Sequence, residues 1–186
     1  MAIYAAVLDA CVMVPVSLCD TLLRLAEERM FRPVWSERIL GETSAAIKAV
    51  HPDIPEGLID QRIQFMGEGF PGACVGGIES IEVALELPDA DDRHVLAAAI
   101  RSRADAIVTA NIKDFRAEIT ANFDVEVIHP DDFLMSQLDM RSRTVLDTLL
   151  AQANAAKNPR LSLDDVLNSL ARAGVPRFVD EVRRRL

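Results

Sequence analysis

Short apolar runs alternate with helical patterns along the first two thirds of the chain. Residues 3–8 form an apolar run that ends at Asp9, as expected for a buried parallel strand. Residues 106–109 and 125–128 are two further short runs of this kind. Stretches with helical spacing separate the runs, at residues 18–30, 36–50, 56–70 and 93–103. This order predicts an α/β protein with a mainly parallel sheet.

The last third of the chain has only helical patterns. Asn158 and Pro159 interrupt one helix, and the pair Ser162 and Asp165 has the spacing of a capping box at the start of the next. We therefore predict an α/β domain over residues 1–136 and a helical extension over residues 137–186.

Charge is unevenly distributed between these two parts. The whole chain carries a net charge of −9, which argues against a protein that coats nucleic acid with a broad basic surface. Residues 137–186 contain 9 Lys and Arg against 6 Asp and Glu, a balance of +3, so the first 136 residues carry −12. Binding of a polyanion would need bridging cations or the basic extension.

The sequence has no feature of a membrane or secreted protein. The amino-terminal run meets Asp9 early and has no basic leader, and no stretch reaches the roughly 18 apolar residues of a membrane helix. A cytoplasmic protein is expected. The cysteines Cys11, Cys19 and Cys74 have no metal-binding spacing, and we expect them to be buried reduced thiols.

Polar side chains follow the carboxyl ends of two predicted strands. Asp9 follows the first strand, and Asn111 and Asp114 follow the strand at 106–109. Ligands of parallel sheets bind at this edge, and the helix that leads into the second strand begins there with Asp91 and Asp92. Either acid could cap this helix while the other faces the site. Asp9 and Asp114 could likewise be turn acids.

Glu42 is the fourth candidate acid, on the flank of the helix at 36–50. An isolated helix glutamate is usually solvated, so Glu42 is a candidate only because it lies near the same edge of the sheet as the other acids. Carboxylates gathered in one cleft repel one another unless a cation joins them, and oxygen donors without histidine or cysteine suit Mg²⁺ or Mn²⁺. Such ions polarise phosphodiesters and activate water. A haloacid-dehalogenase-like phosphatase is disfavoured, because Cys11 stands where its second acid is needed, and a receiver domain lacks its acid pair.

Four motifs resemble the PIN-domain nucleases, in particular VapC-type toxins of toxin–antitoxin pairs. They are VLDACV, WSERILGE, PDADDRHVLAAAI and IVTANIKDF, in this order within residues 1–135. The resemblance implies a three-layer α/β/α, RNase H-like nuclease sandwich. It also implies that the metal-binding and catalytic residues are Asp9, Glu42, Asp92, Asp114, Asn111 and Thr109, of which the four acids are the metal ligands.

The function that the resemblance implies is Mg²⁺- or Mn²⁺-dependent cleavage of RNA, commonly tRNA or rRNA, with inhibition by a cognate antitoxin. Two positions depart from the family pattern: Gly41 replaces a polar or acidic residue, and Asn111 replaces a fourth aspartate in many relatives. The alternative is a catalytically inactive PIN-like module that binds RNA or protein. The helix at 18–30 has enough apolar surface for a homodimer. The extension at 137–186 resembles that of a subgroup of PIN-domain proteins with an added carboxyl-terminal helical region.

Overall fold

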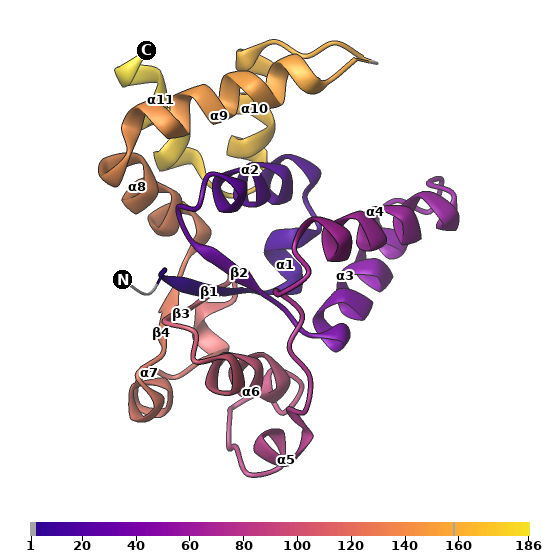
Figure 1. Ribbon diagram of the computed structural model, residues 1–186, viewed down its shortest axis with the longest axis vertical. Helices are drawn as coiled ribbons and strands as arrows, with labels where there is room; N and C mark the ends of the chain where they lie inside the picture. Colours follow the sequence, from indigo (N-terminus) through magenta and orange to yellow (C-terminus); the bar gives the residue numbers. More distant parts are fainter. Residues whose placement is uncertain (1–2, 158) are drawn as a thin grey trace.

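The computed structural model describes residues 3–157 and 159–186, and in these residues four short strands form one parallel sheet between layers of helices (Figure 1). The strands are β1 (Ala5–Leu8), β2 (Arg32–Val34), β3 (Ala106–Val108) and β4 (Glu126–Ile128). Figure 1 shows α2 on one side of the sheet and α6 on the other, which confirms the predicted three-layer α/β class.

The helices follow the predicted order. They are α1 (Ala10–Met13), α2 (Val16–Glu27), α3 (Glu37–Val50), α4 (Glu56–Gly69), α5 (Glu79–Glu82), α6 (Arg93–Ser102), α7 (Ala117–Thr120), α8 (Pro130–Met140), α9 (Ser142–Ala155), α10 (Leu163–Arg172) and α11 (Pro176–Arg185). Two 3₁₀ turns, η1 (Ile112–Asp114) and η2 (Ala121–Phe123), follow β3. Within the described part of the chain, no helix combines the length and the apolar character needed to cross a bilayer.

The strand order is β2-β1-β3-β4, so β1 and β3 occupy the centre of the sheet. The chain leaves β1 toward β2 on one side, whereas it leaves β3 toward β4 on the other. Connections that diverge from two neighbouring parallel strands leave a crevice at their carboxyl ends, which is the usual ligand site of such sheets. In Figure 1, β1 runs toward α1 and α3, which lie beyond this edge.

The strand β2 was missed by the sequence prediction. It has three residues, and Pro33 at its centre lacks the N–H that a central strand needs. Because β2 is an edge strand that pairs with β1 on one side, the missing donor is tolerated. A short bridge between Trp35 and Cys74 extends this edge.

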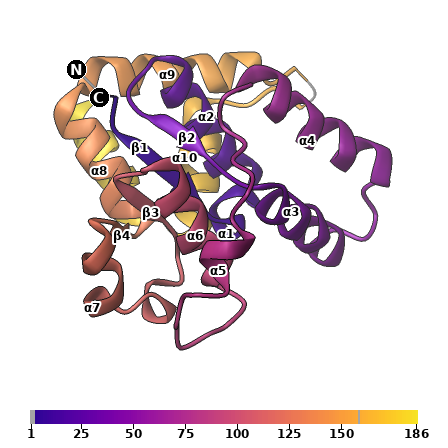
Figure 2. The ribbon, with the colours of Figure 1, turned by 60° about the horizontal axis from the view of Figure 1, so that its bottom comes forward.

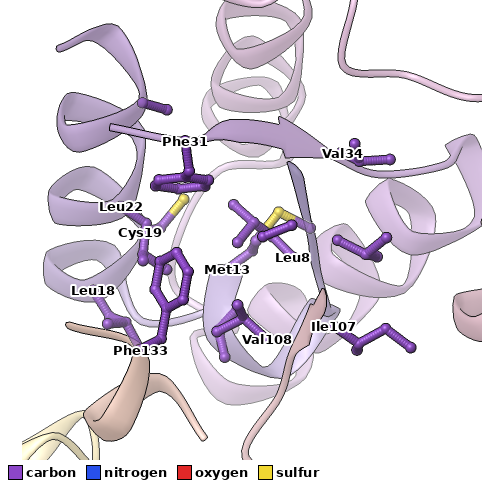
Figure 3. Close-up of a cluster of buried hydrophobic side chains, with 14 of the residues drawn as sticks. Leu8, Met13, Leu18, Cys19, Leu22, Phe31, Val34, Ile107, Val108 and Phe133 are labelled. Carbon is purple, nitrogen blue, oxygen red and sulfur yellow. The ribbon is translucent and has the colours of Figure 1, made fainter. Parts of the chain in front are cut away.

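The core fills both faces of the sheet. Figure 3 shows Val108 and Ile107 on opposite sides of β3, as the alternation of side chains along a strand requires. On the α2 side, Phe31 and Phe133 meet edge to face with ring centroids 5.0 Å apart. Because both faces are covered, these strands are continuously apolar rather than alternating.

The carboxyl-terminal helices pack on α2. The Thr21 hydroxyl donates to Gln152 Oε1 at 2.7 Å, and the amide of Gln152 donates to the carbonyl of Ser17 at 3.0 Å. Ser169 on α10 reaches the Ser17 hydroxyl at 3.0 Å. The buried face of α2 is thus covered within the chain, with α9 and α10 beside it in Figure 2. A homodimer through residues 18–30 stays a prediction.

Candidate active site

Asp9 and Thr109 lie side by side where the two central strands end. Asp9 follows β1, and its backbone N–H donates to the carbonyl of Val108 at 3.2 Å. Thr109 follows β3, and its hydroxyl donates to Asp9 Oδ2 at 2.6 Å. Both side chains are buried. The predicted positions of these two residues at one sheet edge are therefore found in the structure.

Asp9 is held by further donors around its carboxylate. Its Oδ1 accepts the backbone N–H of Ala10 at 2.7 Å, which caps the amino end of α1. The Cys11 thiol lies 3.2 Å from Oδ2, and the backbone N–H of Ala110 donates to Cys11 Sγ at 3.3 Å. Burial, and then the charge of Asp9, raise the pKa of Cys11 to about 11, so the protonated thiol is a donor to the carboxylate.

The prediction that all three cysteines are buried is wrong for two of them. Cys19 is buried, but Cys11 and Cys74 are exposed as whole residues, and all three are free. The Cys11 thiol itself is turned inward onto Asp9 and Thr109. Cys11 lies beside the site because it follows Asp9 by two residues on α1. Its contacts with Asp9 and Thr109 could not be read from its spacing to the other cysteines.

Asp92 faces the same crevice from the amino end of α6. It occupies the N-cap position, but its backbone is helical and its side chain makes no capping hydrogen bond. Its Oδ2 is buried without a hydrogen-bond partner among the described residues. Burial raises the pKa of Asp92 to about 6, and repulsion adds to this shift from the neighbouring carboxylates of Asp9, Asp89, Asp114 and Glu42. The other three predicted acids, Asp9, Asp114 and Glu42, are thus close enough to raise the pKa of Asp92.

Asp91 points elsewhere. Its side chain is 93% exposed, and its backbone N–H donates to Asp89 Oδ1 at 2.9 Å. Asp91 Oδ1 lies 3.9 Å from Arg38. Of the two neighbouring acids that the sequence left as alternatives, Asp92 is the one directed into the crevice.

Glu42 reaches the site edge from α3. Ser36 caps this helix by accepting the backbone N–H of Ile39 at 3.2 Å, which fixes where the helix begins. Glu42 Oε1 then accepts a hydrogen bond from Arg38 Nε at 3.2 Å and lies 3.1 Å from His94 Nε2. The carboxylate is half-exposed and is held by two donors.

The sequence interpretation missed His94, because it expected a site of oxygen donors without histidine. His94 is 1% exposed and lies on the buried face of α6, two residues after Asp92. Burial lowers the pKa of His94, although Glu42 opposes this shift. The available signal was a histidine on an otherwise apolar helix face directly after a candidate ligand.

Asn111 and Asp114 contact each other in the turn after β3. The Asn111 amide donates to Asp114 Oδ2, and the Asn111 backbone N–H donates to Thr109 Oγ1 at 3.0 Å. Asp114 belongs to the turn η1, which places its carboxylate near Asp92. The predicted corner of Thr109, Asn111 and Asp114 is thus linked to Asp9 through the threonine hydroxyl.

The donor set suits a hard divalent cation. Carboxylate oxygens dominate the crevice, and the buried, unpartnered Oδ2 of Asp92 provides an acceptor that a cation would satisfy. Among the described residues, however, no three His, Cys, Asp or Glu side chains stand close enough together to hold an ion. Binding would therefore require side-chain movement, which the half-exposed Glu42 permits.

The arginines of the extension are engaged with acids. Arg185 pairs with Glu181 at 2.8 Å and also with Asp139, and Arg177 pairs with Asp132. These two arginines are therefore paired with acids, one of which, Asp132, lies outside the predicted extension, and the extension keeps its balance of +3.

Comparisons with known proteins agree with this arrangement. Residues 5–113 match the family model described as PIN domain, and residues 130–184 match the one described as VapC50 C-terminal domain. The protein named Putative ribonuclease VapC50 from Mycobacterium tuberculosis (strain ATCC 25618 / H37Rv) is 39% identical over 93 residues, which cover 50% of this chain and 54% of that protein. The match therefore spans about half the length of this relative. No solved structure matches the chain.

Proposed function

Because the chain belongs to the PIN-domain family, we propose that it is a metal-dependent endoribonuclease of the VapC toxin type that hydrolyses RNA phosphodiester bonds. Its substrate would be a tRNA or rRNA, and a cognate antitoxin would inhibit it. These RNAs would place the protein in the cytoplasm.

The surroundings of Asp92 carry this proposal. The Asp92 carboxylate has an oxygen that is buried without a partner, and burial, with added repulsion from neighbouring acids, raises its pKa to about 6. Such a group is unfavourable in its charged form unless a proton or a cation is bound. At neutral pH a divalent cation would relieve this repulsion. The acidic cluster is thus better explained as a cation site than as a set of turn and cap acids.

Each residue of the site would have a distinct role in cation binding or catalysis. Asp9 and Asp92 would be the main ligands, while Glu42 and Asp114 would be ligands or would orient the attacking water. Mg²⁺ or Mn²⁺ would polarise the phosphodiester and stabilise negative charge as the bond to the leaving oxygen breaks. Thr109 would hold Asp9 in place through its 2.6 Å hydrogen bond, and Asn111 would position the turn that carries Asp114.

Substitution of Asp9 tests the proposal. Asp9→Asn keeps an oxygen that can cap α1 but removes one negative charge from the crevice, so we expect the fold to be retained or slightly stabilised. RNA cleavage should fall by about a hundredfold or more, because a main ligand is lost. Mn²⁺ should raise the melting temperature of the wild type but not of the variant. Cleavage that persists in excess EDTA would contradict the proposal.

A module that binds RNA or protein without cleaving it is the second candidate. Expression in bacteria distinguishes the two at low cost. A toxin should arrest growth, and Asp9→Asn should relieve the arrest, whereas an inactive module should give the same growth with or without the substitution. If growth is arrested, sequencing the ends of RNAs from induced cells would then identify the substrate and the cleavage position.

A further inference from the structure

Four side chains meet beside the acidic crevice and connect three helices. Arg38 of α3 contacts Glu42 Oε1 at 3.2 Å and Glu82 Oε1 of α5 at 2.6 Å. Its Nη2 also lies 3.4 Å from the carbonyl oxygen of Asp91. His94 of α6 contacts the same Oε1 of Glu42 at 3.1 Å. Two donors from different helices therefore converge on one carboxylate oxygen.

We propose that Arg38 and His94 form a clamp on Glu42, in which His94 positions this carboxylate for the divalent cation and Arg38 lowers the affinity for that cation. The inference rests on the proposed function, since it assumes that a cation binds in the crevice. Both residues are positioning residues that act through Glu42.

The surroundings of His94 indicate that its main polar role is to hold Glu42. The ring is almost completely buried, and its Nδ1 has no hydrogen-bond partner in the part of the chain that the structure describes. Burying an imidazole nitrogen without a hydrogen-bond partner costs free energy of folding, so the contact with Glu42 is the polar interaction that offsets this cost. His94 Nε2 lies 3.1 Å from Glu42 Oε1, so this nitrogen makes the contact of the ring with the carboxylate.

Arg38 differs from His94 because it brings a positive charge. It is 42% exposed and is anchored by Glu82, so it remains beside Glu42 when the carboxylate turns toward the crevice. A fixed guanidinium repels a second cation and competes with it for the same oxygen. Loss of His94 and loss of Arg38 should therefore change cation affinity in opposite directions, which a purely structural role would not produce.

Calorimetric titration with Mn²⁺ alone tests the clamp on the full chain without RNA. Arg38→Gln should lower the dissociation constant for Mn²⁺ by about three- to fivefold, as expected for loss of a partly screened charge. Arg24→Gln is the matched control, because Arg24 also pairs four residues apart, with Asp20 at 3.0 Å, but on α2. It should leave the dissociation constant unchanged.

The His94 variants give the second readout. His94→Leu removes the imidazole nitrogen that contacts Glu42 and should raise the Mn²⁺ dissociation constant by about tenfold, the usual effect of removing a residue that orients a ligand. His94→Gln keeps an N–H at a similar distance along the side chain and should recover part of the affinity. If His94→Leu fails to fold, the Mn²⁺ dissociation constants of Arg38→Gln and His94→Gln still test the clamp.

The outcomes separate this inference from the proposed function. Mn²⁺ binding by the wild type with the same dissociation constant in Arg38→Gln would overturn the clamp and leave the proposed nuclease intact. Weaker binding in Arg38→Gln would also overturn it, because Arg38 would then support the cation rather than oppose it. No Mn²⁺ binding by the wild type would count against both.

Discussion

The pKa of Asp92 reflects both its burial and the charges around it. Its pKa of about 6 is raised first by burial and then by the charges of neighbouring acids that come from four different segments. A helix-capping aspartate would be stabilised in its charged form by the amino end of the helix, and its pKa would fall. The shift in the opposite direction agrees with the missing capping hydrogen bond and makes this carboxylate a source of instability when it is charged.

The stability of the cation-free protein should therefore depend on Asp92 in a defined pH range. The unfolded carboxyl titrates near 3.8 and the folded one near 6, so between these values the folded protein binds more protons. The free energy of unfolding should fall as the pH rises through this range. In EDTA, Asp92→Asn should flatten this dependence and stabilise the protein at pH 8 by about 1 kcal/mol, after allowance for solvent screening. Urea unfolding at several pH values measures both effects.

Asp91→Asn is the control for this prediction. Asp91 precedes Asp92 directly but is 93% exposed, so its substitution should leave the pH dependence of unfolding unchanged. Equal pH profiles for the wild type and Asp92→Asn would show that repulsion within the crevice does not reach this carboxylate.

At the scale of elements, the amino end of α11 is capped by a residue of α8. Its first residue is Pro176 and its N-cap residue, Val175, has no side-chain acceptor. The buried carboxylate of Asp131 on α8 takes this role, accepting the backbone N–H groups of Arg177 at 3.1 Å and Phe178 at 2.8 Å. It satisfies donors that a helix start leaves open and places a negative charge at the positive end of the helix dipole.

Removal of this cap should loosen α11 specifically. Asp131→Ala should cost about 1–2 kcal/mol of unfolding free energy, the usual range for a lost amino-terminal cap. Hydrogen exchange of the α11 amides should accelerate more than that of α3. The neighbouring Asp132→Ala removes an exposed ion pair with Arg177 and should have little effect. If both variants behave alike, the capping role of Asp131 is wrong.

The sequence predicted elements well where local rules decide them. The capping box of Ser162 and Asp165 is present at the start of α10, and Ser36 caps α3. Both depend on residues three positions apart, which a sequence reveals. The strand β2 escaped notice because Pro33 argues against a strand, and only pairing with β1 makes this position acceptable. The cap of α11 by Asp131 joins residues 46 and 47 positions apart, which no local pattern could reveal.

The candidate site was predictable to a similar depth. Strand ends and helix starts brought Asp9, Asp92 and Asp114 to one edge because parallel topology fixes where those ends lie. The pairing of Glu42 with Arg38 is a local one, four residues apart on α3, but the contact of Glu42 with His94 was not predictable because it depends on how α3 packs beside α6. The sequence therefore indicated which residues meet but not which of them hold one another in place.

At the scale of the whole molecule, the division at residues 136 and 137 remains a prediction, although α8 (Pro130–Met140) runs across it. The extension shares α2 with the nuclease part, through the buried contact between Thr21 and Gln152 and through a continuous apolar core. Phe133 of α8 packs edge to face against Phe31, which directly precedes β2. Both parts therefore use the same buried surface.

This shared core predicts that the chain unfolds in one step. Trp35, the single tryptophan, is buried next to β2 and reports on the nuclease part by fluorescence, whereas far-ultraviolet circular dichroism also records α9 to α11. In urea the two signals should have the same midpoint, because loss of α9 and α10 would expose the apolar face of α2. Thr21→Val breaks the buried hydrogen bond to Gln152 and should lower the free energy of unfolding by about 1–3 kcal/mol. Both urea midpoints should fall together. If Thr21→Val lowered only the dichroism midpoint, the extension would be a separate folding unit, and the covered face of α2 would not be needed to keep the nuclease part folded.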